Sequence, residues 1–269
     1  MSFDRLSRRD FLKRSGLALA AFGLGAGAGC AEDQSEFSFI VLNDTHYLDG
    51  KCAEYFRAAF GWVEANAQYD FALVCGDLAT AGKVEELQGM KDALALLGKP
   101  AYPVMGNHDA SEGNQSWLQV FGPERVNYRL DHQGWTFLGL NTTDDGKSSG
   151  VAVSQATIDW LRQALPGIPA ERPLVAFTHF PFGELVPLRL TNADEVLALF
   201  EGHNPKHIFS GHFHGLSERK HGDAVLTTCR CLSFSRGNHD GSPEKGFFRC
   251  HVKGEELVYE FVEYRPEGQ

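Results

Sequence analysis

The sequence predicts a layered domain of mixed α/β class. Between residues 37 and 210, short apolar segments with strand character alternate with segments of helical periodicity. After Val225 the pattern changes to consecutive strands, which points to antiparallel β-structure at the C-terminal end of the same domain. A chain of 269 residues with 43% hydrophobic content is long enough to bury the core that such a domain requires.

The individual elements follow from this patterning in chain order. The expected strands are 37–42, 71–75, 101–105, the hairpin pair 127–130 and 135–140, 174–178 and 207–210. The expected helices are 52–67, 84–97, 154–165 and 192–200. Ser154 is the expected N-cap of its helix, and Asn192 with Glu195 has capping-box spacing at the next one. The C-terminal strands are expected within 224–234, 246–252 and 256–264, the last two joined by a turn at Lys253 and Gly254.

The first 29 residues differ from the rest and have the pattern of an export signal. Basic residues precede an apolar segment, 16–29, that is rich in Gly and Ala and too short to span a bilayer. The stretch Ser-Arg-Arg-Asp-Phe-Leu-Lys at 7–13 resembles the twin-arginine signature, which directs folded proteins to a bacterial export machinery. We therefore expect a twin-arginine signal peptide (1–29), a linker (30–36) and one domain (37–269), located in the periplasm or cell envelope. The alternative is an amphipathic or disordered N-terminus with a chance arginine pair.

Cys30 lies where the apolar segment ends, in a context similar to a lipobox, whose cysteine receives lipid. Gly27 stands where such a motif usually has Leu, and cleavage after Ala28 is the alternative. Membrane attachment is therefore expected only through lipid on Cys30. The five other cysteines are odd in number and lack zinc-site spacing, and we interpret Cys229 and Cys231 as neighbouring buried thiols.

The charge of the chain argues against one class of partner. Formal net charge is −10 and the sequence has no long basic stretch, so no nucleic-acid-binding surface is evident. Acidity does not exclude a small phosphorylated substrate, because a bound metal ion reverses the field locally.

Five short polar clusters each begin where an apolar strand is expected to end. In an open α/β sheet, binding residues gather at the carboxyl ends of the strands, so these clusters should meet at one edge. Alone, an Asp-x-His or Gly-Asp pair is more often a turn or surface feature, and only the full set predicts a site. The clusters contain Asp44 and His46; Gly76 and Asp77; Gly106, Asn107, His108 and Asp109; His179; and Gly211, His212 and His214.

The mixture of residue types in these clusters indicates metal chemistry. Imidazole and carboxylate together suit Zn, Fe or Mn, and the amide oxygen of Asn107 can add a further ligand. One carboxylate can bridge two cations, and two metals about 3.5–4 Å apart can clamp the attacking and leaving oxygens of a phosphoryl displacement. The residue types therefore predict a metal site, and two divalent transition metals held there would suit a phosphoester substrate.

Asp-x-His, Gly-Asp, Gly-Asn-His-Asp, a lone His and Gly-His-x-His, in this order, resemble the calcineurin-like metallophosphoesterase superfamily. The resemblance extends from Phe37 essentially to the C-terminus and implies two mixed β-sheets packed as a sandwich and flanked by helices (αββα layers), with a dinuclear centre at one edge. It implies that Asp77 bridges the two metals. The implied ligands are Asp44, His46, Asp77 and His214 for one metal, and Asp77, Asn107, His179 and His212 for the other.

The same resemblance implies the reaction. A hydroxide bridging the metals would attack phosphorus, and His108 would act as general acid or charge stabiliser beside the leaving oxygen, with Asp109 orienting it. Two departures narrow the branch: Thr80 stands where purple acid phosphatases have a metal-binding Tyr, and the Asp-Arg-Gly segment of protein phosphatases is missing. What remains resembles compact bacterial phosphodiesterase-like members. We expect phosphodiester hydrolysis; the alternatives are a broad phosphomonoesterase that scavenges phosphate, and an inactive metal-binding module of the cell envelope.

A second copy of Gly-Asn-His-Asp occurs at 237–240, after Gly-His-x-His and outside the superfamily order. It lies in a segment rich in turn-forming residues, 235–243, and we interpret it as a coincidence. The alternative is a substrate-facing loop near the metals, in which Arg236 or His239 contacts phosphate. No other substrate-binding residue is identified from the sequence.

Overall fold

The computed structural model describes residues 35–111 and 113–265. The expected signal peptide (1–29), Cys30 and the linker up to residue 34 lie outside the described residues, while Glu36 already belongs to the first strand. Within the described part of the chain, no helix is both long and apolar enough to cross a membrane.

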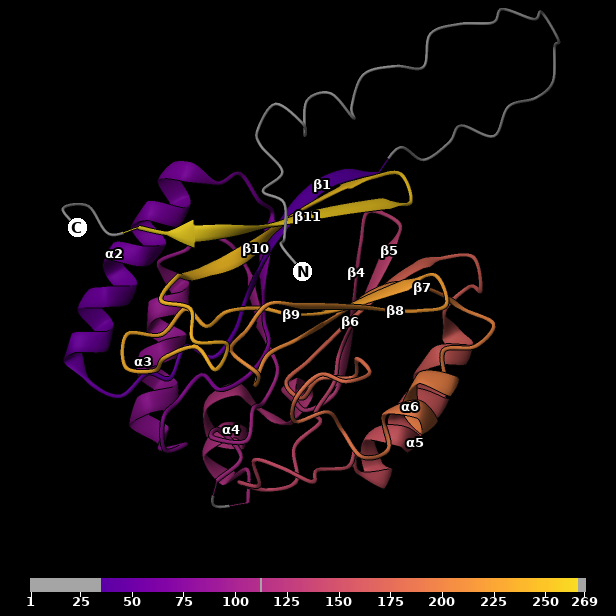
Figure 1. Cartoon of the computed structure of the whole chain (residues 1–269), viewed down its shortest axis with the longest axis horizontal. Coiled ribbons are helices and arrows are strands. Elements are labelled where there is room, and N and C mark those ends of the chain that lie inside the picture. The colour runs from indigo at the N-terminus through magenta and orange to yellow at the C-terminus, as the bar shows by residue number, and fades with distance from the viewer. Residues whose placement is uncertain (1–34, 112, 266–269) are drawn as a thin grey trace, which may run out of the picture. The chain divides into compact units, whose positions relative to one another are not determined.

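The domain contains two mixed β-sheets, as expected (Figure 1). The first sheet has the order β11-β10-β1-β2-β3, and the second has the order β4-β5-β6-β7-β9-β8. The strands of the first are β1 Glu36–Leu42, β2 Phe71–Val74, β3 Ala101–Pro103, β10 Lys245–Lys253 and β11 Glu256–Tyr264. Those of the second are β4 Tyr128–His132, β5 Trp135–Gly139, β6 Pro173–Thr178, β7 Asn204–Ser210, β8 Ser217–His221 and β9 Ala224–Thr228.

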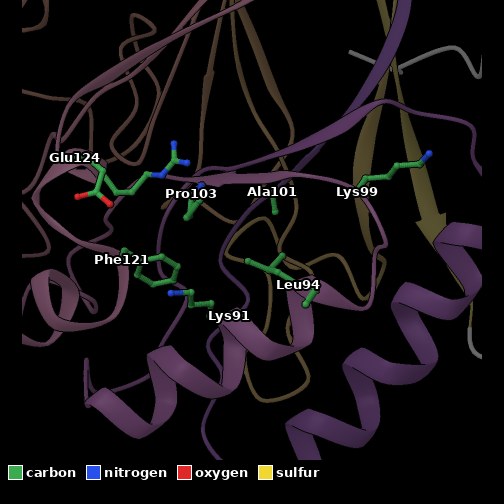
Figure 2. A pocket seen from close by; sticks show the side chains of 9 residues that line it. Lys91, Leu94, Lys99, Ala101, Pro103, Phe121 and Glu124 are labelled. Carbon is green, nitrogen blue, oxygen red and sulfur yellow. The ribbon is translucent and has the colours of Figure 1, made fainter.

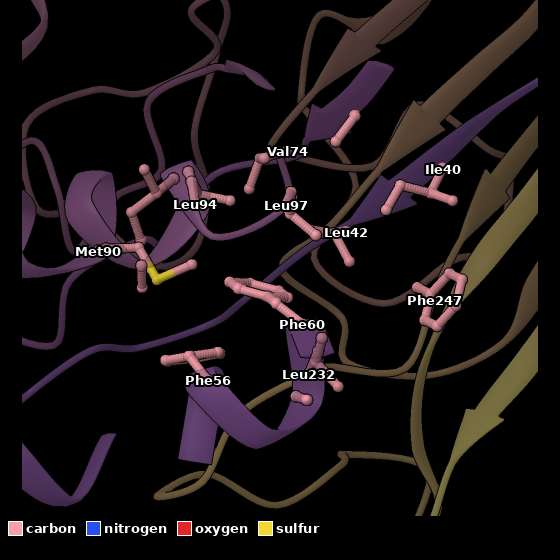
Figure 3. Close-up of a cluster of buried hydrophobic side chains, with 14 of the residues drawn as sticks. Ile40, Leu42, Phe56, Phe60, Val74, Met90, Leu94, Leu97, Leu232 and Phe247 are labelled. Atoms are coloured by element: carbon pink, nitrogen blue, oxygen red, sulfur yellow. The ribbon is translucent and has the colours of Figure 1, made fainter. Parts of the chain in front are cut away.

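Helices cover the outer face of each sheet (Figure 1). Cys52, Phe56 and Phe60 recur along one face of α2 and pack into a core with first-sheet residues such as Ile40 and Leu42. Figure 3 shows Phe56 and Phe60 of α2 in this cluster together with Ile40 and Leu42. The helices on this side are α2 Gly50–Asn66, α3 Val84–Ala95 and α4 Gln115–Phe121, followed by the short 3-10 helix η1 Pro123–Arg125. The second sheet is covered by α5 Gln155–Ala164, η2 Leu165–Gly167 and α6 Ala193–Ala198.

Aromatic side chains fill the space between the two sheets. The ring of Phe39 on β1 stacks on Phe71 at 5.3 Å and meets the edges of Phe137 at 5.4 Å and Phe209 at 6.0 Å, which belong to the second sheet. Each fully buried side chain of this kind contributes about 1.5–3 kcal/mol, so this layer fixes one sheet against the other.

The strand directions decide where the polar clusters lie. β1, β2 and β3 run parallel to one another, and so do β5, β6, β7 and β9. The carboxyl ends within each parallel set therefore point to one edge of their sheet. β9 belongs to the second set, so the chain that follows Thr228 leaves the sheet at the same edge as the chain that follows Ser210.

Most expected elements are present, with a few corrections. The capping box at α6 is wrong, because the Asn192 side chain bonds the backbone of Val153 instead of capping its own helix. The strand expected across 224–234 ends at Thr228. α4 and β8 were not expected: α4 is short and has no side-chain cap, and β8, Ser-Glu-Arg-Lys-His, offers no apolar residue to a sequence pattern.

Five cysteines are buried and form no disulfide within the described residues. They are Cys52, Cys75, Cys229, Cys231 and Cys250. Burial raises the pKa of the Cys75, Cys229 and Cys250 thiols, so these groups stay protonated at neutral pH.

His207 is a buried histidine away from the polar clusters. Its Nε2 lies 2.9 Å from the Thr227 hydroxyl, and its ring stacks on Phe209 at 3.8 Å. Burial lowers the pKa of His207 from 6.5 to about 3. Because the folded-state pKa lies below the unfolded value, the neutral ring stabilises the fold above pH 6.5, and this contribution is lost progressively as the pH falls towards 3.

This predicts a specific acid sensitivity. Between about pH 7.5 and about pH 5, the wild-type protein should lose about 2 kcal/mol more unfolding free energy than His207→Gln, which removes the titrating ring. Urea unfolding at both pH values measures the difference, with His221→Gln as the control, since His221 is exposed at the end of β8. Identical pH dependence of the wild-type and His207→Gln proteins would contradict the assignment.

Candidate metal centre

The backbone is left-handed at three of the five polar clusters. Five of the predicted metal ligands adopt a left-handed conformation, which costs side-chain-bearing residues about 1–2 kcal/mol each. They are Asp44 (φ 52°), His46 (φ 47°), Asp77 (φ 52°), His212 (φ 64°) and His214 (φ 44°). Such strain at successive strand ends turns the side chains towards one place and is typical of functional sites.

Two glycines permit the strand ends to approach one another. A Cβ on Gly106 would lie 2.2 Å from the backbone nitrogen of Asp77. A Cβ on Gly211 would lie 2.6 Å from the Cys75 carbonyl oxygen and 2.8 Å from the Asp44 carboxylate. Any side chain at either position would therefore displace a predicted metal ligand or the strand that carries it.

All seven predicted metal ligands come together in the structure. Two groups of buried donors have ligand atoms within 4.8 Å of one another, and Asp77 belongs to both. Asn107 joins the second group, because its Oδ1 lies 3.0 Å from His179 Nε2. The first group is Asp44, His46, Asp77 and His214, and the second contains Asp77, His179 and His212.

Backbone carbonyls fix the orientation of three of the imidazoles. A carbonyl oxygen only accepts hydrogen bonds, so the ring nitrogen facing it carries a proton. The other nitrogen faces the cluster and presents a lone pair whenever the ring is neutral. The pairs are His179 Nδ1 with the Cys75 oxygen at 2.9 Å, His212 Nε2 with the Ser148 oxygen at 2.9 Å, and His214 Nδ1 with the Gly237 oxygen at 3.0 Å.

The resulting donor set fits cations. His179 Nε2 and His212 Nδ1, both lone-pair nitrogens in these tautomers, lie 3.1 Å apart, and both side chains are buried. Buried acceptors facing one another are unfavourable unless positive charge lies between them. Imidazole, carboxylate and amide oxygen donors together suit Zn, Fe or Mn.

The pKa values agree with this assignment for most of the histidines. Burial lowers the pKa of His46, His179 and His212 to about 4, which keeps them neutral at pH 7, the form that binds a metal. His214 differs: burial lowers its pKa, but Asp44 at 3.0 Å outweighs this and raises it to about 11. Burial alone would raise the pKa of Asp44, and the neighbouring histidines, His214 first, lower it overall.

His108 lies beside the donors without belonging to them. Its ring meets that of His46 at 4.8 Å, and its backbone N–H donates to the Asp77 carboxylate at 2.9 Å. The Nδ1 of His108 donates to the Thr80 carbonyl at 2.6 Å, which leaves Nε2 for another partner. Thr80 itself lies outside both donor groups, and its hydroxyl donates to the His46 carbonyl at 2.9 Å.

The expectation that Asp109 orients the His108 imidazole is wrong. The buried carboxylate of Asp109 accepts hydrogen bonds from the backbone N–H groups of Leu78, Ala79 and Gly106, at 3.1, 2.8 and 2.9 Å. Burial, followed by the neighbouring Asp77, raises the pKa of Asp109 well above its usual range. Asp109 therefore ties the loops after β2 and β3 together, and the Thr80 carbonyl orients His108.

The second Gly-Asn-His-Asp copy lies against the centre, contrary to its interpretation as a coincidence. Gly237 supplies the carbonyl that orients His214, and the ring of His239 stacks on the His214 ring at 4.6 Å. Sequence reasoning missed the roles of Ser148 and Gly237, because a backbone carbonyl leaves no signal in residue type. The repeated motif was the one available signal for this loop.

A cavity of about 350 Å³ lies elsewhere, beside the edge strand β3 (Figure 2). Its lining includes Lys91, Lys99 and Arg125 and contains none of the metal-centre residues. Lys91 donates to the Val120 carbonyl at 2.6 Å, and Arg125 lies over the ring of Tyr128. Lys91 and Arg125 therefore have local structural partners.

Comparisons with known proteins find phosphodiesterases among the relatives of this chain. A probable cyclic nucleotide phosphodiesterase of Rhodopseudomonas palustris is 29% identical over 198 residues, which cover 65% of this chain and 71% of the relative. The 3′,5′-cyclic adenosine monophosphate phosphodiesterase of Escherichia coli is 27% identical over 154 residues, 55% of each chain. Among solved structures, GAP50, the anchor in the inner membrane complex of Plasmodium, is similar with a TM-score of 0.60 at 13% identity, covering 85% of this chain and 84% of that one.

The likeness to GAP50 concerns the fold alone. A model of the calcineurin-like phosphoesterase family matches residues 37–216, a segment that contains all seven donors and His108. The chain therefore belongs to the calcineurin-like phosphoesterase family, and it is a metal-dependent phosphoesterase with a buried centre of Asp, His and Asn side chains.

Proposed function

We propose that this protein is a phosphodiesterase with two divalent metal ions, acting on small phosphodiesters outside the cytoplasm. The observation that carries the proposal is Asp77, whose carboxylate belongs to both buried donor groups. A shared carboxylate holds two cations close together, the arrangement that stabilises both the attacking and the leaving oxygen in phosphoryl transfer. Mn, Fe and Zn are the metals that the donor types favour.

The bound metals would supply the activated water and neutralise charge at the phosphoryl group. The residues of the chain supply position and protons. His108 is held by its ring bond to Thr80 and its backbone bond to Asp77, so its Nε2 has one orientation beside the centre. Such a fixed imidazole can donate a proton to the leaving oxygen.

The substrate class rests on the relatives. The Rhodopseudomonas palustris and Escherichia coli proteins are named as cyclic nucleotide phosphodiesterases, and 3′,5′-cyclic nucleotides are therefore the first diesters to test. The resemblance of the sequence to compact bacterial phosphodiesterases points the same way. Phosphomonoester hydrolysis is the competing activity.

The proposed location rests on the sequence of the first thirty residues. Arg8 and Arg9 within the stretch 7–13 support export by the twin-arginine machinery, with cleavage of residues 1–29. Cys30 would then begin the mature protein and carry the lipid that attaches it to the cell envelope. We propose this arrangement because export after folding suits a protein that acquires metals in the cytoplasm.

The substrate preference is tested by direct comparison of esters. Mn²⁺-loaded wild-type protein should hydrolyse bis-p-nitrophenyl phosphate and 3′,5′-cyclic AMP more efficiently than p-nitrophenyl phosphate, measured as kcat/KM. Asp77→Ala should lose metal and roughly a thousandfold or more of this activity while staying folded, because both cations lose a ligand. Asp92→Ala, which removes an exposed carboxylate on α3, is the control.

Any of three results would contradict the proposal. A preference for the monoester would indicate a scavenging phosphatase, and two bound metals without turnover of any ester would indicate an inactive module. Full activity of Asp77→Ala would exclude the dinuclear centre itself.

A general-acid role for His108 predicts a dependence on the leaving group. His108→Asn should lower kcat for 3′,5′-cyclic AMP about 10²–10⁴-fold, because its alkoxide leaving group needs a proton. The loss should be much smaller for bis-p-nitrophenyl phosphate, whose phenolate leaves without protonation. Metal content should stay unchanged, as His108 is outside both donor groups. Equal losses for both esters would show that His108 acts other than as an acid.

Cell fractionation tests the proposed location. Replacing Arg8 and Arg9 together by Lys should retain the protein in the cytoplasm, since the twin-arginine pathway requires the pair. Cys30→Ala should release the exported protein from the membrane fraction and abolish labelling with a radioactive fatty acid. Unchanged fractionation of the arginine variant would exclude this route, and unchanged labelling of Cys30→Ala would exclude lipid at that residue.

A further inference from the structure

The loop that carries the second Gly-Asn-His-Asp copy is brought to the metal centre by the sheet topology. β9 runs parallel to β7, so the chain after Thr228 leaves the second sheet at the edge where His212 and His214 follow β7. Two hydrogen bonds then join the loop to His214. The Nδ1 of His214 donates to the Gly237 carbonyl at 3.0 Å, and the His214 carbonyl accepts from the His239 N–H at 3.1 Å. This loop lies beyond the segment 37–216 that the family model matches.

Four histidines form a chain of neighbouring rings across the first donor group. The ring centroids are 4.8 Å apart for His108 and His46, 5.2 Å for His46 and His214, and 4.6 Å for His214 and His239. The inner two are buried donors, whereas the outer two belong to neither donor group. Each outer histidine is the third residue of a Gly-Asn-His-Asp copy, and both are more accessible than the inner pair.

The position of His239 is held by its neighbours in the loop. The Asn238 side chain accepts from the Cys231 N–H at 3.0 Å and donates to the carbonyls of Ser242 and Glu244 at 2.9 and 2.7 Å. Asp240 accepts from the Ser242 N–H at 2.9 Å and pairs with Arg230 at 3.1 Å. The His239 ring is thus fixed beside His214, with its interplanar angle at 10°.

The His239 ring is free to bind a ligand. Although its backbone is bonded, neither ring nitrogen forms a hydrogen bond with any of the residues that the structure describes, and the side chain is exposed. A phosphoester bound at the centre presents oxygens with partial negative charge, which need hydrogen-bond donors besides the cations. His108, which neighbours His46, can donate to such a group from one end of the chain of rings. His239, which neighbours His214, is the imidazole at the other end.

We propose that His239 is a further substrate-contacting residue, which donates a hydrogen bond from its imidazole to a phosphoryl oxygen of the bound ester. The inference rests on the proposed phosphoesterase function and adds a residue to it. The competing explanation is that the His239 ring only packs against His214 and steadies that ligand.

Two substitutions separate these explanations. His239→Phe keeps a flat ring against His214 but removes the N–H donor, whereas His239→Ala removes both. If His239 contacts substrate, both variants should keep the metal content of the wild type and lose about tenfold to a hundredfold in kcat/KM for bis-p-nitrophenyl phosphate. Affinity of the Mn²⁺-loaded protein for inorganic phosphate, measured by calorimetry, should fall by a similar factor. His221→Phe, at the far end of the β8–β9 hairpin, should change neither quantity.

The contrary results are distinct. Wild-type kcat/KM and phosphate affinity in His239→Phe would overturn the inference and leave the proposed function intact. Loss of metal in His239→Ala that His239→Phe restores, together with activity, would assign the ring to packing and also overturn it. A wild-type protein that hydrolyses no phosphoester would overturn the proposed function, and phosphate affinity of the variants would still decide the role of His239.

Discussion

Mutual repulsion among buried acceptors is the constraint on which the rest of this structure depends. Two carboxylates and four imidazoles converge in a buried site, in which the lone-pair nitrogens of His179 and His212 lie 3.1 Å apart. Bringing them together costs free energy unless cations neutralise them. The backbone is also adapted to this convergence, because Asp44 and Asp77 adopt left-handed conformations and glycine stands where no Cβ fits. The aromatic layer between the sheets supplies the rigidity that keeps these strand ends in place.

The residue types predicted the metal ligands, because side chains carry the ligating atoms. Their positions at strand ends predicted that they meet. All seven donors indeed lie together, and the apolar strands were largely located from their composition. Backbone groups were beyond such reasoning: the carbonyls of Ser148 and Gly237 orient His212 and His214, and the Thr80 carbonyl takes the role expected of Asp109. β8 was not predicted, because an exposed edge strand of charged and polar residues lacks the alternation of apolar and polar positions that marks a strand.

The two Gly-Asn-His-Asp copies show why a motif has no fixed meaning. After β3, the Oδ1 of Asn107 faces His179 Nε2 as a predicted metal ligand. The Oδ1 of Asn238 instead accepts a hydrogen bond from the Cys231 N–H within its own loop. The aspartates are more alike, since Asp109 and Asp240 both accept backbone N–H groups and hold their turns. What differs is the tertiary setting: one copy follows a strand of the first sheet directly, and the other depends on the direction of β9, which sequence patterning does not specify.

The five buried thiols bear on the proposed export. In an oxidising compartment, an unfolded chain with several reactive cysteines would form mispaired disulfides, some of them between molecules. Within the folded domain these thiols are inaccessible, and burial keeps Cys75, Cys229 and Cys250 protonated. The proposed export would therefore require the fold to be complete before the chain leaves the reducing cytoplasm, so that these thiols are already protected from oxidative cross-linking.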